Sequence, residues 1–316
     1  MYVKESGGSW VKIAGTFGGL LKIRQEKPDL VVAVYEGDNR ERIEELVGLE
    51  AGLWHKPFEK LIERLPFRDL LDKLAECYPG VRIPVAPHDF NCILISTALS
   101  RRTSYERFVL NWCRKIWKLY GCNIEEIVQL PLSQLRKISS SYQVLQLKTI
   151  LQDFLKLDLE ELFRLHPDAV RLRLLSSIRL LGPKAVDSLI FTTFKEAVHF
   201  TPCDTHLYTV CLRLGLIESE GVLMPQKNLC AKYVCTEVAS KVVGVPLCPK
   251  AENCLRARLS WLGEAGGWLQ TIAYIHGSKI CRRQKPLCSQ CNLKQICQHP
   301  PTSRSVSYTH LTLPTN

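Results

Sequence analysis

Leu174-Leu-Ser-Ser-Ile-Arg-Leu-Leu-Gly-Pro-Lys-Ala-Val-Asp187 is the most informative stretch of this sequence, because its pattern predicts a helix, a tight turn and a second helix. Gly182 is expected to adopt a backbone conformation closed to most residues, and Pro183 suits the first position of the following helix. Backbone N–H groups at such a turn and at a helix start attract phosphate. Gly182 and Pro183 are therefore candidate phosphate contacts.

Lys184 lies in the first turn of the second predicted helix. The positive end of the helix dipole disfavours an ammonium there, so the pKa of Lys184 should lie below that of an exposed lysine. A neutral amine is a nucleophile, which makes Lys184 a candidate catalytic residue. The alternative is a surface lysine that contacts a DNA phosphate, and this stretch leaves both interpretations open.

A second motif, Cys203-Asp204-Thr205-His206, precedes an apolar helical run that ends at Gly215. Asp204 is predicted to cap that helix. A capping aspartate can also turn one oxygen towards a neighbouring cavity and stabilise positive charge that develops there. His206 is expected to be packed or hydrogen-bonded, and Cys203 either lines a pocket or fills the core.

Four cysteines near the end of the sequence have the spacing C-x6-C-x2-C-x5-C. They are Cys281, Cys288, Cys291 and Cys297. Zinc ribbons prefer two separated C-x2-C pairs, so this spacing suits a four-iron cluster better than a single zinc ion. A structural zinc site and two disulfides are the alternatives. A basic loop between the first two cysteines would be held against phosphate, through Arg282, Arg283 and Lys285.

Four further cysteines, Cys230, Cys235, Cys248 and Cys254, are unevenly spaced. They are expected to be small buried residues, with a second metal site as the alternative.

The composition favours a polyanionic partner. The 316 residues include 42 Lys and Arg against 31 Asp and Glu, a formal net charge of +11. Nucleic acid and an acidic membrane surface both fit that excess. No apolar run is long enough for a membrane span, and the first ten residues have no signal-peptide core. Fourteen cysteines then indicate a reducing interior and metal binding rather than disulfides, so we expect an intracellular, DNA-associated protein of the cytoplasm or nucleoid.

The three motifs together resemble the helix-hairpin-helix (HhH-GPD) DNA glycosylases of the endonuclease III class, over residues 90–299. The resemblance implies a mainly α, two-lobed helical fold with a C-terminal iron–sulfur loop. It also implies that Lys184 attacks the sugar C1′, that Asp204 assists, and that the four-cysteine tail binds a [4Fe–4S] cluster. Leu180 replaces the first of the two usual hairpin glycines, and residues 216–262 include an insertion.

The beginning of the chain resembles the leading domain of 8-oxoguanine and 3-methyladenine glycosylases. Three strand-like runs, at 9–14, 19–24 and 30–35, precede a helix at 39–49. We therefore expect a small α+β N-terminal domain (1–85), a helical core with the hairpin near 179–184 (86–215) and the remainder of the second lobe with the cluster loop (216–300). Residues 301–316 are expected to be a disordered or artefactual tail without function.

The predicted function is a base-excision-repair glycosylase with AP lyase activity, acting as a monomer, without a membrane, on double-stranded DNA with damaged bases or abasic sites. Arg101 and Arg102 fall where relatives fill the hole left by a flipped base, although a solvated basic turn fits them equally. The lesion is an oxidised base, with purine and pyrimidine both open. The alternatives are a monofunctional mismatch or alkyl-base glycosylase and a non-catalytic iron–sulfur DNA-binding protein.

Overall fold

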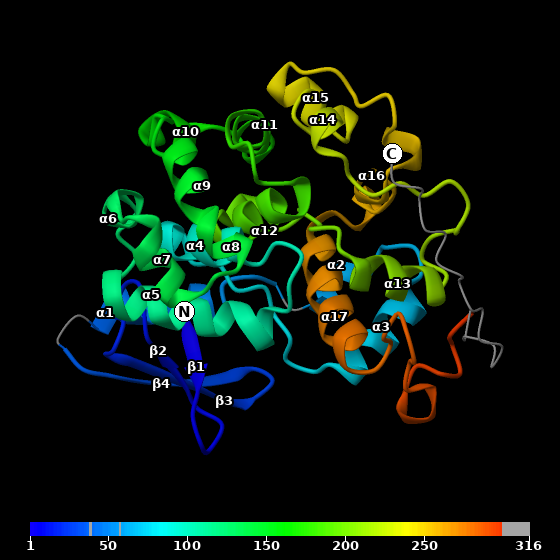
Figure 1. Cartoon of the computed structure of the whole chain (residues 1–316). Coiled ribbons are helices and arrows are strands. Elements are labelled where there is room, and N and C mark those ends of the chain that lie inside the picture. The colour runs from blue at the N-terminus through cyan, green and yellow to red at the C-terminus, as the bar shows by residue number, and fades with distance from the viewer. Residues whose placement is uncertain (38–39, 57, 299–316) are drawn as a thin grey trace.

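A computed structural model describes residues 1–37, 40–56 and 58–298. It is mostly helical, with one small antiparallel sheet at the N-terminal end of the chain (Figure 1). The prediction of a mainly α fold with a small α+β N-terminal part is therefore confirmed. The expected tail, residues 301–316, lies outside the described residues.

The sheet is a four-stranded meander in the order β1-β2-β3-β4, with every neighbouring pair antiparallel. Its strands are β1 (Tyr2–Lys4), β2 (Trp10–Lys12), β3 (Leu21–Lys27) and β4 (Leu30–Tyr35). Strand β1 was not predicted, because three residues carry too little alternation to be recognised. Helix α1 (Arg40–Glu50) buries Ile43 and Leu46 with Leu21 of β3 in a small separate core.

The first helical lobe surrounds α4, which contacts α5, α9 and α12. Its helices are α4 (Phe90–Leu99), α5 (Leu110–Tyr120), α6 (Ile124–Gln129), α7 (Leu132–Ile138), α8 (Tyr142–Leu145), α9 (Leu147–Phe154), α10 (Leu159–Arg164), α11 (Pro167–Ser177) and α12 (Pro183–Thr193). A 3-10 turn (Pro87–Asp89) precedes α4, a π-helical turn (Tyr105–Val109) precedes α5, and another 3-10 turn (Lys195–Ala197) follows α12. The helical core predicted for residues 86–215 consists of several short helices. Pro131 and Pro167 lie at the starts of α7 and α11, since proline cannot continue a helix from its preceding turn.

The second lobe combines two helices that precede the first lobe in the sequence with helices that follow it. Helix α13 (Thr205–Arg213) packs along α17 (Gly266–Lys279), and α2 (Phe58–Ile62) and α3 (Arg68–Cys77) lie beside them (Figure 1). Phe58 stacks on Trp268, whose indole N–H donates to the carbonyl of Val81 at 3.2 Å. The N-terminal helices thus complete the core of the second lobe.

The segment between α13 and α17 is irregular and packs against α11. It contains α14 (Lys227–Cys230), α15 (Glu237–Val243), α16 (Leu255–Arg258) and 3-10 turns at Ala251–Asn253 and Ser260–Ala265. Isolated parallel bridges join Leu223 to Cys254 and Val234 to Leu247. Cys230, Cys235 and Cys254 are buried, as expected for small core residues, whereas Cys248 is only half-buried.

A buried ion network ties this segment to the hairpin helices. Arg171 of α11 donates to Asp187 of α12. The guanidinium of Arg256 in α16 lies 3.3 Å from the other oxygen of Asp187 and 3.8 Å from Asp168. All four side chains are almost fully buried, so each charge depends on its partner.

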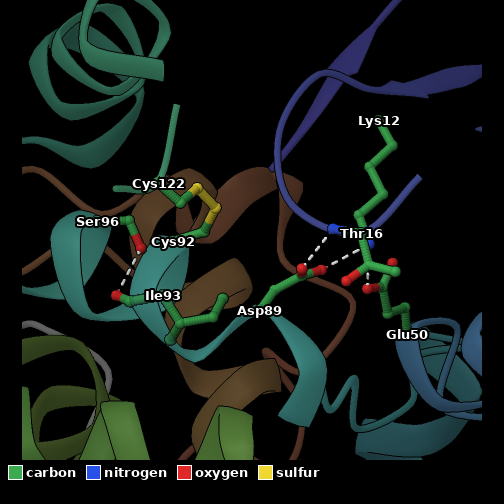
Figure 2. The surroundings of a disulfide bond; sticks show 8 residues. All are labelled: Lys12, Thr16, Glu50, Asp89, Cys92, Ile93, Ser96 and Cys122. Carbon is green, nitrogen blue, oxygen red and sulfur yellow. Dashed lines mark hydrogen bonds and ion pairs between the residues drawn. A yellow bond between two sulfur atoms is a disulfide. The ribbon is translucent and has the colours of Figure 1, made fainter. Parts of the chain in front are cut away.

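Cys92 of α4 and Cys122, which follows α5, form a disulfide with a Cα–Cα distance of 5.1 Å (Figure 2). The expectation that the cysteines serve metal binding rather than disulfides is therefore wrong for this pair. The two residues are far apart in the sequence, and only the packing of α5 on α4 brings them together.

A buried lysine joins the sheet to the first lobe (Figure 2). The Lys12 ammonium lies 2.5 Å from Glu50 and 2.6 Å from Asp89, with no exposure of its side chain. Asp89 also accepts the backbone N–H of Thr16 at 2.6 Å. The carboxylates come from the end of α1 and the start of α4, so one cation holds three elements together.

Every helix in the described ranges is too short or too polar to span a lipid bilayer.

Candidate active site

The predicted helix–turn–helix is present, as α11, a turn over residues 178–182, and α12. Gly182 has φ −96° and ψ 171°, an extended conformation that any residue can adopt. The expectation of a glycine-only conformation is therefore wrong. A Cβ added at Gly182 would meet no protein atom within 4 Å, so the glycine instead leaves bare backbone before the first turn of α12.

Lys184 is the second residue of α12 and is half-buried. Burial lowers its pKa below the usual value for lysine, and the carboxylate of Asp204 partly opposes that shift. The predicted direction of the pKa is confirmed. The main cause is loss of solvation, whereas the sequence argument had relied on the helix dipole.

Asp204 caps α13, as predicted, and accepts the backbone N–H of Leu207 at 2.8 Å. It belongs to the second lobe, whereas Lys184 belongs to the first. The chain therefore brings one amine and one carboxylate, from different lobes, close enough for their charges to interact. His206, two residues farther on, packs edge-on against Tyr274 and is not part of this pair.

Arg101 has its guanidinium turned into the protein. It donates to the carbonyls of Ala98 at 2.7 Å and Leu180 at 3.2 Å, and to Gln146 at 3.1 Å. Arg102 is exposed, with φ +50°, and its side chain is available to an external partner. The two neighbouring arginines thus differ in what they can contact.

The four tail cysteines line one pocket at the end of α17. Leu214, Ile280, Pro286 and Leu293 supply its apolar wall. Within residues 1–37, 40–56 and 58–298, no group of three or more Cys, His, Asp or Glu side chains is placed to hold a single metal ion. A zinc ion would draw its thiolates to about 2.3 Å. A four-iron cluster takes one thiolate at each separate corner, so four thiols spread around one apolar pocket fit a cluster better than an ion.

Arg213, the last residue of α13, holds the loop that follows Cys281. Its guanidinium donates to the carbonyls of Arg282 at 2.9 Å and Arg283 at 3.1 Å, and contacts the Cys281 sulfur at 3.3 Å. The side chains of Arg282, Arg283 and Lys285 are exposed. The loop therefore presents its positive charges outward. Arg213 was not singled out from the sequence, where it is one basic residue of a helix end.

His276 reaches the same pocket from α17. Its Nε2 lies 3.8 Å from the Cys291 sulfur, and its Nδ1 is hydrogen-bonded to the Tyr78 hydroxyl at 2.6 Å. No spacing signal in the sequence connects Tyr78 with His276, because the contact depends on α3 joining the second lobe.

Known proteins resemble this chain in part of its sequence and in its fold. No protein-family model matches the chain. The chain is 26% identical to an endonuclease III of Sulfolobus acidocaldarius over an aligned stretch of 133 residues. This stretch is 42% of this chain and 47% of that protein. The chain thus spans about half the length of the curated relative it matches.

Two solved structures share the fold over most of their length. An 8-oxoguanine glycosylase/lyase of Clostridium acetobutylicum, in complex with double-stranded DNA, has a TM-score of 0.64 at 14% identity and covers 88% of this chain and 87% of its own. A 3-methyladenine DNA glycosylase of Archaeoglobus fulgidus has a TM-score of 0.56 at 16% identity and covers 84% and 89%. The chain has the two-lobed fold of the helix-hairpin-helix DNA glycosylases, and the resemblance predicted from its motifs is confirmed.

Proposed function

We propose that this protein is a DNA N-glycosylase with AP lyase activity, which removes oxidised bases from duplex DNA in base-excision repair. The observation that carries the proposal is the pair of Lys184 and Asp204. A half-buried amine with a lowered pKa follows the bare backbone of Gly182 and lies beside a carboxylate of the other lobe. A protein that only bound DNA would need neither group there.

Phosphate binding would begin at the hairpin. Gly182 and Pro183 leave the start of α12 open, and the backbone N–H groups of its first turn are free of intrahelical partners. The exposed Arg282, Arg283 and Lys285 would contact the backbone from the second lobe, and Arg102 would enter the stack near the lesion. The net charge of +11 strengthens each of these contacts at low salt.

The chemistry needs Lys184 as a neutral amine. Burial favours the neutral form by lowering the pKa of Lys184, and in that form the nitrogen lone pair attacks C1′ of a nucleotide that has swung out of the duplex. The C1′–N bond to the base breaks, and the base leaves with its electron pair and takes up a proton. Asp204 stabilises the positive charge that develops on the sugar. The resulting aminal opens: the C1′–O4′ bond breaks, O4′ takes up a proton, and the lysine nitrogen forms the C=N bond of a Schiff base. Loss of a C2′ proton then expels the 3′ phosphate by β-elimination.

The tail cysteines Cys281, Cys288, Cys291 and Cys297 are proposed to hold a [4Fe–4S] cluster. Such a cluster would be structural, since base removal and β-elimination transfer no electrons. Its place beside Arg213 would fix the exposed basic loop in one conformation. Purified protein should contain iron and absorb broadly in the visible range, and Cys281→Ser should lose iron and DNA affinity together.

Borohydride trapping tests the reaction. The protein is incubated with duplexes that contain thymine glycol, 8-oxoguanine, uracil or an abasic site. We expect a covalent protein–DNA band that disappears in Lys184→Gln, and its strength across the panel identifies the lesion. Lys195→Gln, an exposed lysine beyond the end of α12, is the matched control and should trap normally.

The other outcomes point to the remaining alternatives. Release of free base without a covalent band would indicate a monofunctional mismatch or alkyl-base glycosylase, with Lys184 as a phosphate contact. Binding of the duplexes without release or trapping would indicate a non-catalytic DNA-binding protein. Normal nicking by Lys184→Gln would refute the role of the lysine.

A further inference from the structure

We propose that Lys227 is a positioning residue for the hairpin, and that its ammonium and the guanidinium of Arg101 together clamp three consecutive backbone carbonyls of the turn. The inference rests on the proposed function, because it concerns how the hairpin binds DNA. Lys227 lies at the start of α14, in the irregular segment that follows α13.

The contacts are specific to the turn. The Lys227 ammonium donates to the carbonyl of Ile178 and, at 2.6 Å, to that of Arg179. Arg101 donates to the next carbonyl, Leu180, at 3.2 Å. Two cations from different parts of the chain therefore satisfy three carbonyls in a row. We call Lys227 and Arg101 the carbonyl clamp.

These carbonyls need a partner because of their position. Residues 178–180 follow the end of α11, so their carbonyls lie outside the hydrogen-bond pattern of the helix; that of Ile178 also accepts the backbone N–H of Leu181 at 3.4 Å. Neighbouring carbonyl oxygens repel one another unless a donor or a cation lies between them. A positive group on this side also offsets the negative end of the α11 dipole.

The opposite, donor side of the turn is held separately. Asp153 accepts the backbone N–H of Arg179 at 3.2 Å and two nitrogens of its guanidinium at 3.0 Å each. The turn is thus held by an anion on its N–H side and by the clamp on its carbonyl side. Ionic hydrogen bonds are stronger than neutral ones, so the turn is fixed before any ligand arrives.

A fixed turn positions the groups that follow it. Gly182 and Lys184 come immediately after the clamped residues, so a shift of the turn moves the phosphate contact and the nucleophile together. Small misplacements of such groups are costly in affinity and rate. The lysine is held partly out of water, with its pKa lowered by burial, which agrees with a structural rather than a solvent-facing role.

The clamp is tested with Lys227→Ala and a duplex that contains a tetrahydrofuran abasic analogue, which binds without reacting. We expect the Kd for this duplex to rise about tenfold, as for loss of a charged hydrogen bond. Added methylammonium chloride should restore binding, because it supplies an N–H donor where the side chain was removed. Tetramethylammonium chloride at the same ionic strength has the charge but no donor and should not.

Lys232→Ala is the matched control, since it removes an exposed lysine of the same segment and should leave the Kd unchanged. If Lys227→Ala does not fold, Lys227→Met, which has no N–H donor, replaces it. A Kd of the tested variant equal to that of the wild type overturns the clamp. Weaker binding without rescue, with the slope of log K against log salt reduced by about one, would mean that Lys227 contacts phosphate directly and would also overturn it. If the wild-type protein binds no duplex at all, the proposed function is refuted, and the clamp, which rests on that function, is refuted as well.

Discussion

Lys184 and Asp204 act on each other through their charges, and this has a measurable consequence for the proposed reaction. The amine reacts only when neutral, so the rate of Schiff-base formation should rise with pH through the lowered pKa of Lys184. The Asp204 carboxylate raises that pKa, because it favours the ammonium.

Replacing Asp204 with asparagine should therefore lower both the pH at which the rate is half-maximal and the maximal rate. The asparagine keeps a side-chain oxygen for the helix cap, but the negative charge is lost. The pKa of Lys184 falls further, so the pH at which the rate is half-maximal moves to a lower value. The maximal rate drops by about a hundredfold, since the developing positive charge loses its partner.

A single-turnover pH–rate profile measures both effects. Glu196→Gln, at an exposed position beyond α12, should change neither. A half-maximal pH that stays in place or rises in Asp204→Asn would contradict the electrostatic coupling.

At the residue level, the sequence predicted the lowered pKa of Lys184 and the helix cap at Asp204, because both residues belong to short motifs with a local mechanism. It could not indicate the orientation of Arg101. Two adjacent arginines look alike in a sequence, and only the tertiary contact with Leu180 distinguishes the inward from the outward side chain. Lys227 was missed for the same reason, since a lysine in an irregular segment carries no periodic signal.

At the scale of the element, the hairpin has an extended backbone at Gly182, and no protein atom lies within 4 Å of the place where a Cβ would stand. Alanine at this position should fit without strain, because the φ and ψ values are extended. Its methyl group would occupy the space through which a phosphate approaches. Gly182→Ala should therefore keep the melting temperature of the wild type and raise the Kd for duplex DNA.

Gly244 provides the complementary variant. It ends α15 with φ +71°, and a Cβ there would also meet nothing within 4 Å. Gly244→Ala should cost about 1 kcal/mol of unfolding free energy through backbone strain and leave DNA binding unchanged. Equal Kd values for the two variants would remove the argument for phosphate approach at Gly182.

Helical elements were predicted well as a type and poorly in their boundaries. The sequence predicted a helical core over residues 86–215, but not its division into many short helices, such as the break before α11 at Pro167. Strand β1 has only three residues, and its pairing with β2 rather than its own sequence makes it a strand. The disulfide between Cys92 and Cys122 depends equally on how α5 packs.

At the scale of the molecule, the buried Lys12 connects the sheet with the end of α1 and with the start of the first lobe. Lys12→Met would leave Glu50 and Asp89 buried without their cation, which should cost about 3–5 kcal/mol of unfolding free energy. Lys22→Met removes an exposed lysine of the same sheet, paired with Glu5, and should cost about 0–1 kcal/mol. Urea unfolding monitored by circular dichroism compares the two.

The loss in Lys12→Met should also depend on pH. Burial raises the pKa of Glu50, and removal of Lys12 raises it further. The folded protein then binds a proton more tightly than the unfolded chain, so stability declines as pH rises through the pKa of the unfolded carboxyl. The variant should be closer to the wild type at pH 5 than at pH 8, and an equal loss at both would contradict the network.

The arrangement of the lobes was the least predictable part. Nothing in the local pattern of residues 58–77 indicates that α2 and α3 pack against α17, almost two hundred residues away. This contact is decided by which apolar faces remain uncovered once the other helices have formed.

The carbonyl clamp has a consequence for synthesis on the ribosome. The chain emerges from its N-terminus, so α11, the turn and α12 leave the exit tunnel before Lys227 does. A nascent chain that has already formed its hairpin helices would still lack half of the clamp. We therefore expect tight binding of nucleic acid to appear late in translation, after the irregular segment between α13 and α17 has packed against α11.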